Sequence, residues 1–146
     1  MPDMELISGL ISTYRELNHS VRPLPEEQLQ RSNGQGPSAY ELLRELRDRE
    51  MLFSQALKSR TMHAGDHVWS ETEMPTLGLE SDDDTSAMLI AQFGTAREST
   101  LAMLRDLPDA EWDVSEGGKT IRTRVFELLD NDRRQLERIA SAIGAR

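Results

Sequence analysis

The chain contains no cysteine among its 146 residues. That absence excludes a disulfide scaffold, a zinc site with thiolate ligands and a cysteine nucleophile. Basic residues number 17 against 26 acidic ones, a net charge of -9, so the chain repels phosphate backbones and anionic lipid surfaces. No apolar run has the length of a membrane span, and residues 1–5 lack the basic and apolar regions of a signal peptide. These absences predict a cytoplasmic protein that binds neither nucleic acid nor membranes.

Several catalytic signatures are missing as well. The sequence has no Gly-x-Ser-x-Gly nucleophile elbow, no glycine-rich phosphate loop and no dinucleotide fingerprint. His63 and His67 stand four residues apart, which is a ligand spacing on a helix. Gly65 and the loop-like composition around it disfavour a helix there. We therefore interpret this pair as part of a polar loop rather than as a metal site.

Four stretches of the sequence do carry a helical period of apolar residues, and turn residues separate them. Length and composition indicate one domain over residues 1–146. Four amphipathic helices in one domain predict an all-α fold of the four-helix-bundle class. Long loops follow the first and second helices, and a short hairpin fits at Gly117-Gly118. The predicted helices cover residues 3–20, 38–59, 84–106 and 120–143.

Local signals mark the starts of three of these helices. Ser38 and Glu41 form a capping box, in which each side chain satisfies a free backbone amide of the other. The third helix begins after three aspartates, residues 82–84, and Thr85. Either Thr120 or Thr123 caps the fourth helix.

Three charged residues fall on the core-facing sectors when each helix is projected at about 100° per residue. They are Glu50 on the second helix, Arg97 on the third and Asp132 on the fourth; Arg49 also falls inside its sector. A core-facing charge needs a partner or a solvated cavity. The three residues therefore form either a polar pocket or a structural ion network. We favour the network and predict that Arg97 contacts Asp132 or Glu50.

Three stretches also carry a family likeness, at residues 38–50, 93–108 and 123–139. The first contains Glu45-Leu46, the second contains the inward Arg97, and the third reads Asn131-Asp132-Arg133-Arg134-Gln135-Leu136. Together they resemble the DinB/YfiT-like family of four-helix proteins. In that family the second helix has a His before Leu, and the closing helix reads His-Asp-x-x-His before Leu.

The resemblance implies a divalent metal held by three histidines, at the positions that Glu45, Asn131 and Gln135 occupy here. None of the three is His, and carboxamides are poor ligands for Zn²⁺ or Ni²⁺. The expectation is therefore a non-catalytic or ligand-binding family member without a metal cofactor. It would take a small-molecule ligand and, as the family implies, form a homodimer. The alternative is a metal-dependent hydrolase, or a thiol transferase of the mycothiol or bacillithiol type. Such an enzyme would use Glu45, Asp132 and a His from the 60–70 loop as altered ligands.

Overall fold

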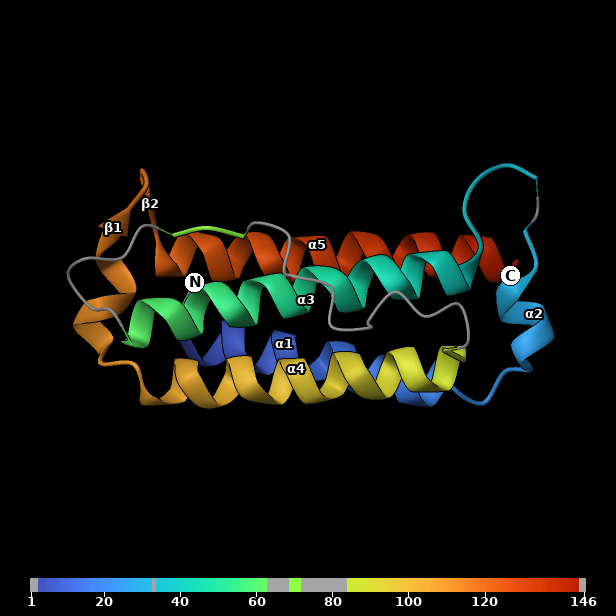
Figure 1. Cartoon of the computed structure of the whole chain (residues 1–146), viewed down its shortest axis with the longest axis horizontal. Coiled ribbons are helices and arrows are strands. Elements are labelled where there is room, and N and C mark those ends of the chain that lie inside the picture. The colour runs from blue at the N-terminus through green and yellow to red at the C-terminus, as the bar shows by residue number, and fades with distance from the viewer. Residues whose placement is uncertain (1–2, 33, 63–68, 72–83, 145–146) are drawn as a thin grey trace.

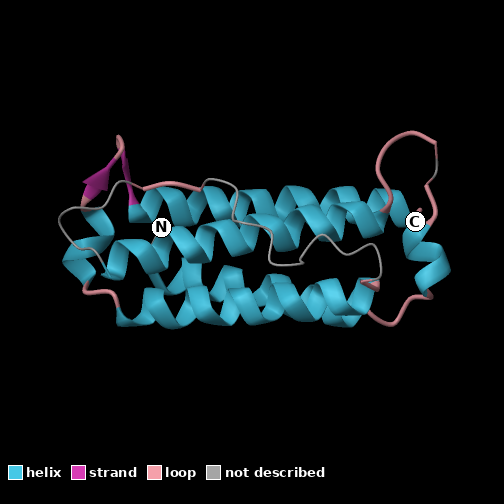
Figure 2. Cartoon of the chain, in the orientation of Figure 1, coloured by secondary structure: helices cyan, strands magenta, loops and turns pink. Residues whose placement is uncertain are grey.

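The computed structural model describes residues 3–32, 34–62, 69–71 and 84–144. Within these ranges the protein is all-α apart from one small hairpin, which confirms the predicted fold class at that level (Figure 2). Long helices lie side by side along the molecule (Figure 1). They are α1 (Asp3–Glu16), α3 (Ala39–Met62), α4 (Ser86–Asp106) and α5 (Ile121–Ile143). Among these residues, no helix combines the length and the apolar character needed to cross a bilayer.

Short elements connect the long helices. The first predicted helix continues past α1 as a π-helix, η1 (Leu17–Val21), and the long loop predicted after it contains a short helix, α2 (Glu26–Gln30). A 3-10 helix, η2 (Asp109–Asp113), precedes the hairpin of β1 (Ser115–Glu116) and β2 (Lys119–Thr120). The hairpin turns at Gly117 and Gly118, both of which have positive φ, as its position in the sequence predicts.

Side-chain caps are present at the starts of α3, α4 and α5. The Ser38 hydroxyl accepts from the Glu41 amide, and the Glu41 carboxylate accepts from the Ser38 amide, so the capping box is confirmed. Thr85 caps α4, and Thr120 rather than Thr123 caps α5.

Contacts between the long helices fix their directions. Tyr40 bonds Asp84 near the starts of α3 and α4, and Thr61 reaches Met103 near their ends, so these two helices run parallel. Helices α1 and α5 also run parallel, since Asp3 pairs with Arg122 and Thr13 with Asp132. The two pairs are antiparallel to each other (Figure 1). The chain therefore runs along the molecule in α1 and returns in α3. Helix α4 runs in the same direction as α3, and α5 runs in the same direction as α1.

The apolar core has two halves. One half is built around Phe53, Leu101 and Trp112, and the other around Leu43 and Phe93. Each long helix contributes apolar residues to both halves of the core. Between these two sets of residues, each helix has a buried polar residue. These residues are Thr13 on α1, Glu50 on α3, Arg97 on α4 and Asp132 on α5. A polar layer therefore separates the two halves of the core.

Two details of the predicted helix faces are wrong. The spacing of Met4 from Ile7 and Leu10 predicts that Met4 faces the core, but Met4 is 81% exposed and Leu6, which that spacing leaves out, is fully buried. On α3, Arg47 is buried where Arg49 was expected to be. Arg47 tolerates burial because it donates to Asp48, Asp84 and Gln92.

Gly94 allows α1 and α4 to approach closely. A Cβ atom at this position would overlap the ring of Tyr14 on α1. The close approach brings the backbone carbonyl of Leu10 within hydrogen-bond distance of the Arg97 guanidinium.

Glu26 of α2 ties that short helix to the start of α4. Its carboxylate accepts from the backbone amide and the hydroxyl of Ser86, both at 2.8 Å, and from Gln30 at 2.7 Å. Partial burial alone would raise the pKa of Glu26, but the hydrogen bonds from Gln30 and Ser86 outweigh it and hold this pKa below its usual range.

We expect this contact to make stability depend on pH. A lowered pKa in the folded state means that Glu26 stabilises the fold above its unfolded pKa, and that this stability is lost as pH falls through the folded pKa. Glu26→Gln should cost about 1 kcal/mol at pH 7, and the cost should disappear between about pH 5 and pH 3. Urea melts at pH 7, pH 5 and pH 3 measure the difference in free energy of unfolding between the parent protein and the variant. Glu27→Gln, a mostly exposed neighbour, is the control, and a pH-independent cost of Glu26→Gln would contradict the assignment.

Candidate functional site

The three core-facing charges predicted from the sequence lie together inside the protein. Arg97 donates from Nη2 to Glu50 Oε1 at 2.7 Å and to Asp132 Oδ1 at 3.0 Å. Its Nη1 donates to Asp132 Oδ2 at 2.9 Å and to the carbonyl of Leu10 at 2.8 Å. Thr13 completes the group by donating to Asp132 Oδ2 at 2.6 Å. We call Thr13, Glu50, Arg97 and Asp132 the buried network.

The charges of this network are tightly coupled. Burial alone would lower the pKa of the Arg97 guanidinium, but Glu50 and Asp132 outweigh that effect and raise this pKa above its usual range. Arg97 therefore stays charged, and it also stacks over the ring of Phe93 at 4.8 Å. One oxygen of Glu50, Oε2, is buried without a hydrogen-bond partner among the described residues.

The buried network is closed to ligands. Each of its four residues is at most 2% exposed. Arg97 makes the predicted contact with both acids. Because all four residues are buried, the group is better interpreted as a structural ion network than as an open polar pocket. Its chemical role is to satisfy charges inside the core.

A surface pocket brings together the three positions that match the family's metal ligands. It has a volume of about 420 Å³ and lies between α3 and α5, with Glu71 from the 69–71 segment on its wall. We call it the triad pocket. Its lining consists of three acids, two arginines, two amides and one leucine: Glu45, Asp48, Glu71, Arg49, Arg138, Asn131, Gln135 and Leu52.

Arg138 links two of the three triad positions. Its Nη1 donates to Gln135 Oε1 at 3.0 Å and lies 3.6 Å from Glu45 Oε1. Gln135 in turn donates from Nε2 to the carbonyl of Leu42, which fixes the amide between α5 and α3. Asn131 stands one helical turn before Gln135 on the same face. On the opposite wall, Arg49 lies 3.9 Å from Glu71.

These residues do not fit the metal that the family resemblance implies. The oxygens of Glu45 and Gln135 already face a guanidinium cation, which would repel a divalent ion placed between them. Amide oxygens from Asn131 and Gln135 are also weak ligands for Zn²⁺ or Ni²⁺. Among the residues that the structure describes, no group of three or more His, Cys, Asp or Glu side chains is arranged to hold a metal.

The altered ligand set is not assembled either. Asp132 is buried, and both of its carboxylate oxygens accept from Arg97, so it does not line the triad pocket with Glu45. His63 and His67 lie outside the described residues.

Three polar residues in or near these sites, Thr13, Glu71 and Arg47, do not stand out in the sequence. Thr13 was missed because a threonine in an apolar stripe gives no charge signal. Glu71 was missed because it lies in a segment without periodicity, held in place by Trp69, whose indole N–H donates to the Glu71 carboxylate at 3.0 Å. Trp69 itself packs edge-on against Phe53. Arg47 alternates with acids along its helix, a pattern typical of a salt-bridged face, and only its partners across the helix interface explain its burial.

Comparisons with known proteins add no relative: no family model matches the chain, and no significant match was found among curated proteins or solved structures.

Proposed function

We propose that this protein is a non-catalytic, ligand-binding four-helix bundle of the DinB/YfiT-like type, and that its triad pocket takes a small zwitterion instead of a metal. One observation carries the proposal. Glu45 from α3 and Asn131 and Gln135 from α5 line one pocket, with the Arg138 guanidinium at the point where the family resemblance implies a cation.

The composition of the pocket supports a zwitterionic ligand. Arg49 and Arg138 offer donors to a carboxylate, while Glu45, Asp48 and Glu71 offer acceptors to an ammonium group. The amides of Asn131 and Gln135 pair with peptide-like groups, which both donate and accept. The volume of about 420 Å³ falls in the range of small-molecule sites and accommodates a dipeptide.

A matched set of dipeptides tests this ligand class. Ala-Ala carries both charges, N-acetyl-Ala-Ala lacks the positive one, and Ala-Ala-amide lacks the negative one. We expect Ala-Ala to bind about tenfold more tightly than either capped form, because each capped form loses one charge-assisted contact. Calorimetry or amide NMR shifts measure the affinities.

Substitutions and metal analysis complete the test. Asn131→Trp should fill the pocket and abolish binding, whereas Arg133→Trp, on the exposed side of the same helix, should not. Protein purified without an affinity tag should hold well under one metal ion per chain. Stoichiometric metal that is lost in Glu45→Ala would overturn the proposal and favour the metal-dependent enzyme. Equal binding of the three dipeptides would overturn the zwitterion assignment.

A further inference from the structure

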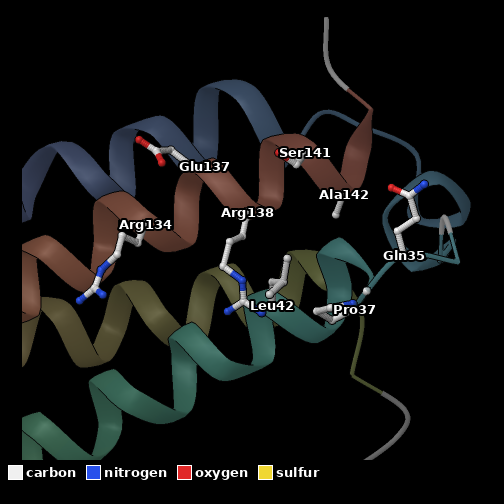
Figure 3. Close-up of a pocket in the computed structure, with 9 residues that line it drawn as sticks. Gln35, Pro37, Leu42, Arg134, Glu137, Arg138, Ser141 and Ala142 are labelled. Atoms are coloured by element: carbon white, nitrogen blue, oxygen red, sulfur yellow. The ribbon is translucent and has the colours of Figure 1, made fainter.

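A second pocket lies beside the triad pocket, at the end of the molecule where α3 begins and α5 finishes (Figure 3). Its volume is about 490 Å³, and we call it the end pocket. Arg138 lines both pockets and therefore forms the wall between them. The lining of the end pocket also includes Arg134, Ser141 and Ala142 from α5, Pro37 just before α3, and Leu42 in the first turn of α3.

The end pocket is cationic on one wall. Arg134 and Arg138 stand four residues apart on α5, and their side chains extend toward α3 (Figure 3). Glu137 also borders the pocket, but its carboxylate points to the opposite side of α5 from the two guanidinium groups (Figure 3). In a chain of net charge -9, these two arginines place guanidinium donors on one wall of the pocket, although each also lies near an acid, Asp130 or Glu45.

The remaining contacts of these arginines leave them able to bind an anion. Arg134 pairs with Asp130 at 2.9 Å, but both side chains are more than half exposed, where such a pair is worth little. Arg138 is half exposed, and among the described residues it contacts Glu45 and Gln135, in both cases through Nη1. Its Nη2 and Nε therefore remain available as donors to a ligand, in the fork geometry that suits a carboxylate.

The lining next to the two arginines is apolar. Pro37 and Ala142, both half-buried, present carbon surface to the pocket, with the buried side chain of Leu42 between α3 and α5, and the Ser141 hydroxyl adds one small polar group. A pocket with two guanidinium groups beside an apolar surface complements a molecule with an anionic head and an apolar body.

We propose that the end pocket binds a small amphipathic organic acid, with its carboxylate on Arg134 and Arg138 and its apolar part against Pro37, Leu42 and Ala142. This proposal does not rest on the zwitterion site. Arg134, Ser141 and Ala142 line the end pocket and not the triad pocket, so the two sites can be altered separately.

Four probes with systematic differences test the proposal on the full chain. 4-Phenylbutyrate has the acid and the apolar body, 4-phenyl-1-butanol lacks the charge, 4-phenylbutylamine reverses it, and inorganic phosphate has no apolar body. Amide NMR shifts locate each probe and give its affinity. We expect 4-phenylbutyrate to shift residues 36, 42, 141 and 142, and to bind about tenfold more tightly than each of the other three probes.

Arginine substitutions then assign the anion contact. Arg134→Gln and Arg138→Gln should each weaken 4-phenylbutyrate binding by about three- to tenfold, since each removes one charged donor. Arg133→Gln makes the same charge change on the same helix outside the pocket and should leave binding unchanged. Ala142→Glu should abolish binding by placing a carboxylate in the pocket, without affecting dipeptide binding at the triad pocket.

Three results would overturn the proposal. The first is no binding of 4-phenylbutyrate, or shifts confined to residues outside the end pocket. The second is equal binding of the alcohol, the amine or phosphate. The third is an Arg133→Gln variant as weak as Arg134→Gln, which would show that overall charge alone attracts the acid.

Discussion

Arg97→Ala is expected to lower the free energy of unfolding by about 3–5 kcal/mol, because it leaves two carboxylates in the core without their cation. Arg97 is 1% exposed and contacts both Glu50 and Asp132. Arg105→Ala, an exposed change on the same helix, should cost under about 1 kcal/mol. Urea melts at pH 7 measure both.

A double-mutant cycle separates the ion contact from simple loss of packing. Asp132→Ala alone should also be costly, but Arg97→Ala combined with Asp132→Ala should cost clearly less than the two added together. Arg97→Lys should recover only part of the stability, because an ammonium group cannot reach both carboxylates and the Leu10 carbonyl as a planar fork does. Additive single effects would contradict a direct energetic contact.

The variant with His at positions 45, 131 and 135 is expected to bind Zn²⁺ or Ni²⁺ more tightly than the parent protein does. The three changes are Glu45→His, Asn131→His and Gln135→His. Positions 131 and 135 share a face of α5, and all three line the triad pocket. Three imidazoles with room for water form the open arrangement of catalytic zinc. Calorimetry should show binding that weakens as pH falls through about 6, where the imidazoles take up protons.

Arg138 provides a second, sharper test of the same site. In the three-His variant its guanidinium should still oppose the metal, so adding Arg138→Met should tighten metal binding by about tenfold or more. Arg134→Met, which removes a charge outside the triad pocket, should have a smaller effect. A correctly folded three-His variant that binds no more metal than the parent would contradict the placement of these positions.

Much of the helical framework follows from the sequence, because helix starts are encoded locally. The Ser38–Glu41 capping box and the threonines at 85 and 120 lie where their side chains satisfy free amides. The coming together of Arg97, Glu50 and Asp132 was also predictable, since a charge on a core-facing sector must find a partner.

The rest depends on neighbours that periodicity does not identify. Arg47 is buried because Asp84 and Gln92, which lie on other segments, accept its hydrogen bonds. Nothing in the α3 sequence distinguishes Arg47 from Arg49. Glu26 accepts hydrogen bonds from Ser86, the first residue of a helix that begins sixty residues later. The end pocket joins a loop, a helix start and a helix end, so no single stretch of sequence contains its pattern.

The parallel pairing of the first and last long helices also bears on the order of assembly. Thr13 and Asp132 are 119 residues apart, so their contact closes almost the whole chain into one loop. Until α5 is made, Arg97 lacks one of its two acidic partners, and α1 and α3 lack the helix that contacts both of them. Contacts of such long range slow folding relative to local ones, because the loop entropy is lost before the contacts form. We infer that during synthesis the domain gains its cooperative stability only when its last helix leaves the ribosome.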